Sequence, residues 1–142
     1  MPGVYDKMGI RFLYPDNWTL DQKDAVGGNL SVTVEAPGGA FWSVAVHPLA
    51  IDPEELALTA LDALRAEYPA AESEPASELI LDQTATGYDV SFFYLDFVNT
   101  ATIRTLRTPV ATCLVLCQAE DREYEALAPV FRAITTSLLS PK

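Results

Sequence analysis

Hydrophobic and polar residues alternate in three short segments near the start of the chain, which predicts half-buried β-strands. The first segment runs from Gly9 to Tyr14 and stops at Pro15-Asp16-Asn17, a turn that should fold Trp18 back against the sheet edge. The other two form a predicted hairpin from Leu30 to His47, which turns at Pro37-Gly38-Gly39. The first strand of this hairpin should have one face in solvent.

A helix is predicted to follow this hairpin, beginning at Asp52. Asp52 can accept a hydrogen bond as the N-cap, Pro53 suits the first helical position, and Glu55 follows three positions after the cap. Pro69 should end the helix. Its apolar stripe, expected to cover one face of the sheet, consists of Ala57, Ala60, Leu61, Leu64 and Tyr68.

Four more strands are predicted between residues 77 and 118, as an antiparallel meander. The second and fourth carry apolar residues on both faces, which is typical of central strands covered by helices. We expect turns at Gly87, Asn99-Thr100 and Thr108-Pro109, and a mobile loop from Ala70 to Ser77. The predicted strands are Ser77 to Thr84, Tyr88 to Val98, Ala101 to Arg107 and Ala111 to Gln118.

A second helical stripe closes the chain, and Pro129 interrupts it. Either one helix is kinked at Pro129, or a short turn from Arg122 to Ala126 precedes a main helix that starts near Pro129; the second arrangement is preferred. The predicted fold is α+β, with a largely antiparallel sheet flanked by an internal helix and a C-terminal helix. Residues 1–142 contain no repeat or linker and should form a single domain. The second stripe consists of Tyr124, Leu127, Phe131, Ile134 and Leu138.

The composition is that of a folded and strongly acidic domain. Of 142 residues, 49% are hydrophobic, which is enough to build a core. Twenty acidic and nine basic side chains give a formal net charge of −11. This charge disfavours nucleic acids and anionic membranes, because both are bound through lysine and arginine. It suits a basic partner, or it simply keeps a hydrophobic domain soluble.

The sequence favours the cytoplasm and predicts no membrane insertion. Its first eight residues lack the charged-then-apolar start of a secretory leader. The longest apolar stretch, Val110 to Cys117, is well under the roughly 18–20 residues that span a bilayer. On one strand Cys113 and Cys117 would lie about 13 Å apart, which is too far for a disulfide. Two buried free thiols are typical of a reducing compartment.

No catalytic or metal site can be assembled from the sequence, so we expect no enzyme activity and no cofactor. His47 is the only histidine, and Ser43 on the same strand face lies about 13 Å away, so a solvent-exposed imidazole is expected. One histidine and two thiols are too few for zinc. Carboxylate clusters and glycine pairs are explained by helix starts and turns. They are Asp52, Glu54 and Glu55; Glu120, Asp121, Glu123 and Glu125; Gly27-Gly28; and Gly38-Gly39.

Aromatic side chains are more numerous than one helix-backed sheet needs to bury, and the surplus could form a protein-binding patch. If Trp42 and Val44 point into the core, Phe41 points away from it and lies exposed or beneath a partner. Core packing is the simpler explanation for any single aromatic residue. The candidate patch consists of Trp18, Phe41, Trp42, Phe93 and Phe97.

Two short segments carry a family resemblance: Phe12, Tyr14, Pro15 and Trp18 at the start, and Pro129, Phe131, Ile134 and Ser137 at the end. With the order of elements, they resemble the PsbP-like superfamily and its small bacterial relatives of unknown function over almost the whole chain. That group includes the extrinsic photosystem subunit, a Ran-binding nuclear transport factor and bacterial chaperones for secreted effectors. The resemblance therefore implies a fold used for protein binding, without a common active site. The missing leader argues against a photosystem or periplasmic role.

Two functional hypotheses follow. The first is a non-catalytic cytoplasmic protein-interaction domain that holds a protein segment on its aromatic sheet residues. Its most concrete form is a chaperone that binds a hydrophobic segment of a secreted or membrane-destined effector, either alone or as a homodimer. The second is a small-molecule-binding or hydrolytic protein with a cavity between sheet and helix, using His47 or the acidic clusters.

Overall fold

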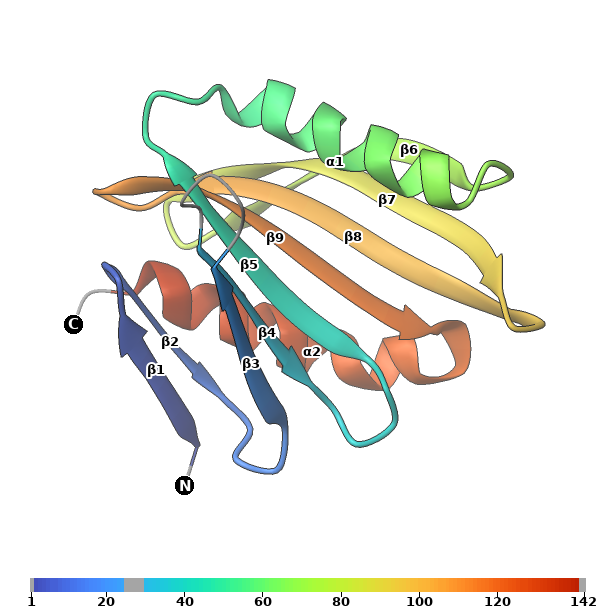
Figure 1. Ribbon diagram of the computed structural model, residues 1–142, viewed down its shortest axis with the longest axis horizontal. Coiled ribbons are helices and arrows are strands. Elements are labelled where there is room, and N and C mark those ends of the chain that lie inside the picture. Colours follow the sequence, from blue (N-terminus) through green and yellow to red (C-terminus); the bar gives the residue numbers. More distant parts are fainter. Residues whose placement is uncertain (1, 25–29, 141–142) are drawn as a thin grey trace.

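Two antiparallel sheets and two helices make up the fold, seen in a computed structural model whose residues 2–24 and 30–140 are described. A small sheet pairs β1 with β2, and seven strands form a large sheet in the order β3-β4-β5-β9-β8-β7-β6 (Figure 1). The predicted α+β class with a largely antiparallel sheet is confirmed. The elements are β1 (Gly3–Lys7), β2 (Ile10–Tyr14), β3 (Thr19–Asp24), β4 (Leu30–Glu35), β5 (Phe41–Pro48), α1 (Pro53–Glu67), β6 (Glu72–Ile80), β7 (Gln83–Tyr94), β8 (Phe97–Arg107), β9 (Ala111–Glu120) and α2 (Asp121–Leu139).

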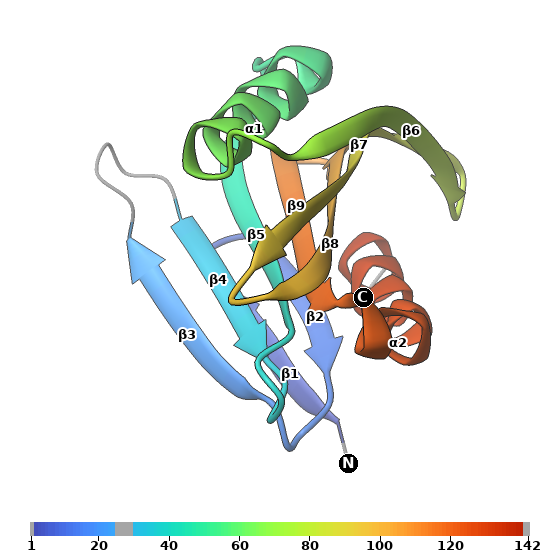
Figure 2. The same ribbon diagram turned by 90° about the vertical axis from the view of Figure 1, so that its right-hand side faces the viewer.

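The two helices lie on opposite faces of the large sheet (Figure 2). Alternation along β9 explains this, since Leu114 packs beside the α1 residue Leu61, whereas Val115 joins the core cluster of the α2 residue Ile134. The β1–β2 hairpin covers the α2 face as well, where Phe12 contacts Trp42 with 4.8 Å between ring centroids. On the other face, α1 makes its main contacts with β7, β8 and β9. Within the described residues, the part of that face formed by β3, β4 and β5 is therefore left largely uncovered by α1.

Several predicted elements are confirmed at their predicted places. The backbone N–H of Glu55 donates to the Asp52 carboxylate at 3.3 Å, which caps α1 as the sequence suggested. The predicted hairpin from Leu30 to His47 is the β4–β5 pair. Gly39 turns this hairpin with a φ of 101°. The predicted Gly27-Gly28 turn lies outside the described residues.

The turns between β6, β7 and β8 are not where they were predicted. They lie at Leu81-Asp82 and Leu95-Asp96, two-residue connections between paired strand ends. Leu81 has a φ of 54°, and Leu95 and Asp96 have φ values of 51° and 68°. Tight hairpins require such positive φ values, which glycine or asparagine usually supplies, so leucine gave no turn signal in the sequence.

Gly87 and Asn99-Thr100, which were predicted as turns, lie inside β7 and β8. Gly87 is needed for a different reason, because a Cβ atom there would lie 1.8 Å from the carbonyl oxygen of Ile103 on the neighbouring strand. The glycine therefore permits a close approach of two backbones. This correction lengthens both strands and extends the hairpin they form.

Three further expectations are corrected. The predicted mobile loop from Ala70 to Ser77 is mostly the edge strand β6. Pro129 lies inside one continuous helix, so the preferred arrangement with a separate start near Pro129 is wrong. β1 and β3 were not predicted, because both are short and polar and contain too few apolar positions to show a period.

Candidate functional site

The histidine and serine singled out in the sequence do not assemble a catalytic site. The Ser43 hydroxyl accepts a hydrogen bond from Thr33 Oγ1 at 3.1 Å. His47 lies near the end of β5 and is half-buried, contrary to the prediction of an exposed imidazole. Burial lowers the pKa of His47. Within the described residues, no hydrogen bond or ion pair joins His47 to an acidic or nucleophilic side chain.

Both cysteines belong to the core, as predicted. Cys113 and Cys117 are buried and free on the α2 face of β9. Burial raises the pKa of each thiol to about 12, which keeps both protonated and unreactive at neutral pH. Among the described residues, no group of three or more His, Cys, Asp or Glu side chains could hold a metal ion.

The predicted acidic clusters lie at the starts of the two helices. Asp52 caps α1, and Glu54 and Glu55 lie in its first turn. At the start of α2, Asp121 accepts a hydrogen bond from Thr100 Oγ1 at 2.6 Å, and Glu120 forms an ion pair with Arg122. The dipole at a helix start favours both sets, and Asp52 also accepts from a free N–H group of α1, whereas Glu120 makes no side-chain cap hydrogen bond in α2.

A cluster of four charges joins α2 to three strands. The Arg104 guanidinium, whose side chain is only 11% exposed, donates to Glu78 and Asp89 at 2.8 Å each. Glu78 also accepts from Arg132 of α2 at 2.6 Å. Each of the four groups has an oppositely charged partner. Glu78, Arg104 and Arg132 line a hollow of about 570 Å³, and their charges are already paired within the cluster.

Two members of the predicted aromatic patch are core residues and cannot contribute to a surface. Trp42 is fully buried and donates its indole N–H to Thr135 Oγ1 at 2.9 Å. Trp18 is buried and meets the ring of Phe131 edge-on, with 6.0 Å between centroids. The sequence could not separate these two from the rest, because both the core and a binding surface favour tryptophan.

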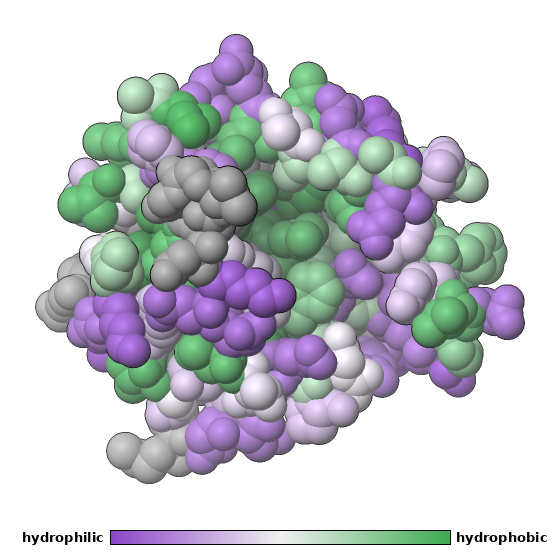
Figure 3. All heavy atoms as spheres, in the orientation of Figure 1, coloured by the Kyte–Doolittle hydropathy of each residue, from purple (hydrophilic) through white to green (hydrophobic). Residues whose placement is uncertain are grey.

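Phe41 lies on the part of the sheet that α1 leaves open. Trp42 and Val44 point into the core, so Phe41 points to the opposite face, as predicted. Ala45 lies on this face opposite Leu114, and Ser43 lies opposite Leu116. Figure 3 shows a hollow in the middle of this side of the molecule, with hydrophobic residues at its floor. Phe41, Leu114 and Leu116 are partly buried there.

The remaining two members of the patch lie at the end of the long β7–β8 hairpin. Phe93 is 74% exposed and Phe97 45% exposed. The structure adds Leu95, which is 72% exposed, and Tyr94, which is 48% exposed. We call Phe93, Tyr94, Leu95, Asp96 and Phe97 the hairpin tip. Leu95 was not included in the predicted patch because the patch was sought among aromatic residues, and the turn that exposes it was expected at Asn99-Thr100. Tyr94 belongs to the surplus of aromatic residues but was not among the five patch residues.

The hairpin tip is supported by contacts with aromatic and basic side chains of neighbouring elements. Tyr68, which follows the last residue of α1, stacks on Phe92 with 4.2 Å between centroids and meets Tyr94 edge-on at 6.1 Å. On the other side the Arg122 guanidinium lies over the Phe97 ring at 4.8 Å. Residues at the C-terminal end of α1 and at the start of α2 therefore restrain the tip.

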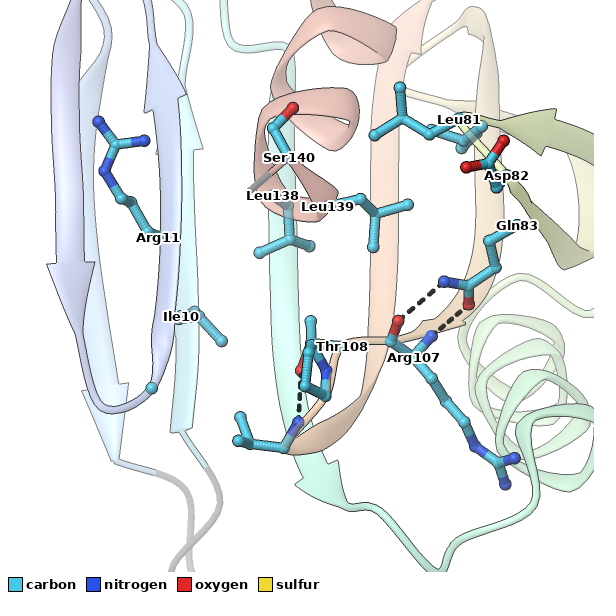
Figure 4. Close-up of a pocket in the computed structure, with 14 residues that line it drawn as sticks. Ile10, Arg11, Leu81, Asp82, Gln83, Arg107, Thr108, Leu138, Leu139 and Ser140 are labelled. Carbon is cyan, nitrogen blue, oxygen red and sulfur yellow. Dashed lines mark hydrogen bonds between the residues drawn. The ribbon is translucent and has the colours of Figure 1, made fainter. Parts of the chain in front are cut away.

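A groove of about 640 Å³ lies at the opposite end of β7 (Figure 4). Its walls include Ile10 and Leu138, which are buried, and Val110, which is 63% exposed. Arg11 and Arg107 direct their guanidinium groups away from it, towards Asp6 and the carbonyl oxygen of Ile51. The groove is therefore mainly apolar and offers little charge to a ligand.

Comparisons with known proteins identify the fold. No family model matches the chain, and no curated protein matches it. Cyanobacterial PsbP from Synechocystis sp. is 13% identical over 96% of this chain and 90% of that one, with a TM-score of 0.62. PA94, a protein of unknown function from Pseudomonas aeruginosa, is 11% identical over 99% and 98% of the two chains, with a TM-score of 0.52. In the described part of the chain, no helix has the length and apolar character to cross a membrane. The chain has the PsbP-like fold.

Proposed function

We propose that the protein is a non-catalytic protein-interaction domain that holds an apolar segment of a partner at the hairpin tip. One observation carries this proposal: four large hydrophobic side chains, Phe93, Tyr94, Leu95 and Phe97, lie within five consecutive residues and are 45–74% exposed. Soluble proteins seldom expose adjacent apolar side chains of this size, and interaction sites are the usual exception.

The composition and support of the tip suit protein binding. Tyrosine and phenylalanine are enriched at interfaces because they supply large contact areas with few rotatable bonds. Here Tyr68 and Arg122 already restrain Tyr94 and Phe97, so less side-chain entropy is lost when a partner binds. The open sheet face around Phe41 offers a second apolar area for a longer segment.

The more specific proposal is a cytoplasmic chaperone for a secreted or membrane-destined effector. It is supported by the resemblance described above, by the acidic composition and by two buried thiols that suit a reducing compartment. A chaperone needs to cover an apolar segment rather than transform it. The isolated His47 and the mutually engaged charges around Arg104 agree with such a non-catalytic role.

The experiment is fluorescence anisotropy with a labelled peptide of about 18 residues, made of leucine and serine with leucine at helical i, i+3, i+4 and i+7 spacing. We expect the native protein to bind this peptide and Phe93→Ser to weaken binding by more than about tenfold. Leu81→Ser, which removes an exposed leucine from the turn at the other end of β7, is the matched control and should bind normally. Equal binding by all three proteins would overturn the proposal.

A second candidate function is supported by the groove near Leu138. Its volume of about 640 Å³ falls within the usual range for small-molecule sites. An apolar ligand there would raise the melting temperature of the native protein, and Leu139→Asp would abolish that shift without affecting peptide binding at the hairpin tip. A ligand-induced rise in melting temperature that persists in Leu139→Asp would contradict this second function.

A further inference from the structure

The chemistry of the partner can be inferred from the charges around the hairpin tip. Four carboxylates surround it: Glu67 at the end of α1, Asp96 in the turn, and Glu120 and Asp121 at the start of α2. Contacts with the β7–β8 hairpin and with Tyr68 place these carboxylates near the tip. Asp121 is hydrogen-bonded to Thr100 of β8, and Glu120 lies opposite Asn99. Burial and then the carboxylate of Glu67 raise the pKa of Tyr68, which contacts Tyr94.

Arg122 is the basic residue seen at this surface, and it is already engaged. Its guanidinium lies over the ring of Phe97 and forms an ion pair with Glu120. This internal contact shows how the site can accept a cation: an aromatic face binds the cation from one side and a carboxylate from the other. Asp96 and Glu67 beside the same tip have no basic partner among the described residues, so their charges are available to a second molecule.

We propose that the hairpin tip binds a basic amphipathic segment, in which apolar side chains contact Phe93 and Leu95 while neighbouring lysine or arginine residues face Asp96 and Glu67. The inference rests on the proposed function and adds the charge of the partner to it. Apolar contacts provide most of the affinity at such a surface. The carboxylates select a basic partner over an acidic one and speed the encounter.

The test uses four labelled peptides. Three have leucine at the same positions and lysine, serine or glutamate at all others, and the fourth consists of lysine and serine without leucine. We expect the leucine–lysine peptide to bind at least about tenfold more tightly than the leucine–glutamate peptide at low salt, with the difference shrinking as salt screens the charges. A lysine–serine peptide without leucine should bind weakly, because charge alone does not fill the apolar surface.

A double variant and a matched control show whether the preference for the lysine peptide arises at the hairpin tip. Asp96→Asn with Glu67→Gln should weaken binding of the leucine–lysine peptide by about two- to fivefold for each charge removed, and leave the leucine–serine peptide unaffected. Asp82→Asn is the control, because Asp82 occupies the corresponding place in the Leu81-Asp82 turn at the far end of β7. If Asp82→Asn had the same effect, the preference would come from the net charge of −11 and not from the tip.

The failure of this inference can be separated from the failure of the proposed function. Equal affinity for the lysine and glutamate peptides, with loss of both in Phe93→Ser, would overturn the basic partner and leave the apolar site in place. No binding of any leucine peptide would overturn both. A second copy of the chain as occupant would also overturn the inference, and light scattering would then show a dimer that Phe93→Ser converts to a monomer.

Discussion

Leu95 combines two unfavourable properties in one residue. Its φ of 51° lies in the left-handed region, and its side chain is 72% exposed. A left-handed backbone costs a residue with a Cβ atom about 1–2 kcal/mol, and an exposed leucine gains nothing from burial. Strain of this kind persists where function requires it. The same description applies to Leu81 at the other end of β7.

Leu95→Asn should therefore stabilise the protein and weaken peptide binding. Asparagine adopts positive φ readily and is favoured in this turn, so we expect a gain of about 1 kcal/mol, or a rise of about 2–4 °C in melting temperature. Thermal unfolding followed by circular dichroism measures it. A lower melting temperature in Leu95→Asn would show that the leucine contributes to the fold itself.

The close backbone approach at Gly87 makes a second prediction at the level of one residue. Gly87→Ala should lower the free energy of unfolding by about 1–3 kcal/mol, because the added methyl group meets the Ile103 carbonyl oxygen and one of the two strands must move. Urea unfolding gives the value. Ser91→Ala on the same strand is exposed and should leave the midpoint unchanged. Equal midpoints for both variants would contradict the steric explanation.

For the candidate site, the sequence indicated that aromatic residues form the surface, but it did not show which of these side chains are exposed. Phe93 and Phe97 were predicted as part of a surface patch and are exposed, whereas Trp42 is buried under α2. The difference depends on which strand face a helix covers, and that is decided by contacts between residues 93 positions apart, such as Trp42 and Thr135. The periodicity within one strand cannot show which face of that strand a helix covers.

At the scale of elements, Arg104 connects three strands and a helix. It lies on β8, pairs with Glu78 on β6 and Asp89 on β7, and shares Glu78 with Arg132 of α2. β6 has no other neighbour in the sheet besides β7. The cluster is therefore a link between the edge of the sheet and the rest of the molecule.

Arg104→Met should destabilise the protein by about 2–4 kcal/mol, since Asp89 would lose its basic partner and Glu78 one of its two, and both carboxylates are only about one-third exposed. Urea unfolding tests this, and hydrogen exchange should show the largest loss of protection in β6. Arg122→Met is the matched control, because the Arg122 side chain is 74% exposed, against 11% for Arg104, and its loss should not shift the midpoint measurably. Similar losses in the two variants would contradict the difference in burial.

Element types were easier to predict than their boundaries. α1 begins with an N-cap, a proline and acidic residues, and the β4–β5 hairpin has a glycine turn, so local chemistry defined both. The β7–β8 turn has leucine at a positive φ, where glycine or asparagine is usual, and tertiary pairing overrides the local preference there. β3 has few apolar residues because it is an edge strand, and the helical period alone could not show that α2 continues through Pro129.

At the scale of the whole molecule, the core thiols should make the folded state less stable as the pH becomes alkaline. In the folded state the pKa of Cys113 and of Cys117 is about 12, against about 8.5 in an unfolded chain. Above about pH 9 the unfolded state releases protons that the folded state keeps. The free energy of unfolding should therefore fall as pH rises, by about 2 kcal/mol per thiol at pH 10.

Urea unfolding between pH 7 and 10 measures this slope, with a variant carrying both Cys113→Ala and Cys117→Ala as the control. The variant should be less stable at pH 7 and lose less stability with rising pH. Native thiols should also fail to react with a thiol reagent at pH 8 and react fully in urea. Rapid reaction in the native protein would contradict their position in the core.

The edges of the large sheet restrict how copies of this protein, or its partners, can associate. β6 carries Pro75, which has no N–H to donate, and the charged residues Glu72, Glu74 and Glu78. β3, at the other edge, contains Asp21 and Lys23. Proline and charge at an edge oppose the addition of another strand, which is the first step of sheet aggregation. Association through edge-strand pairing is therefore disfavoured, and concentrated protein should resist fibril formation.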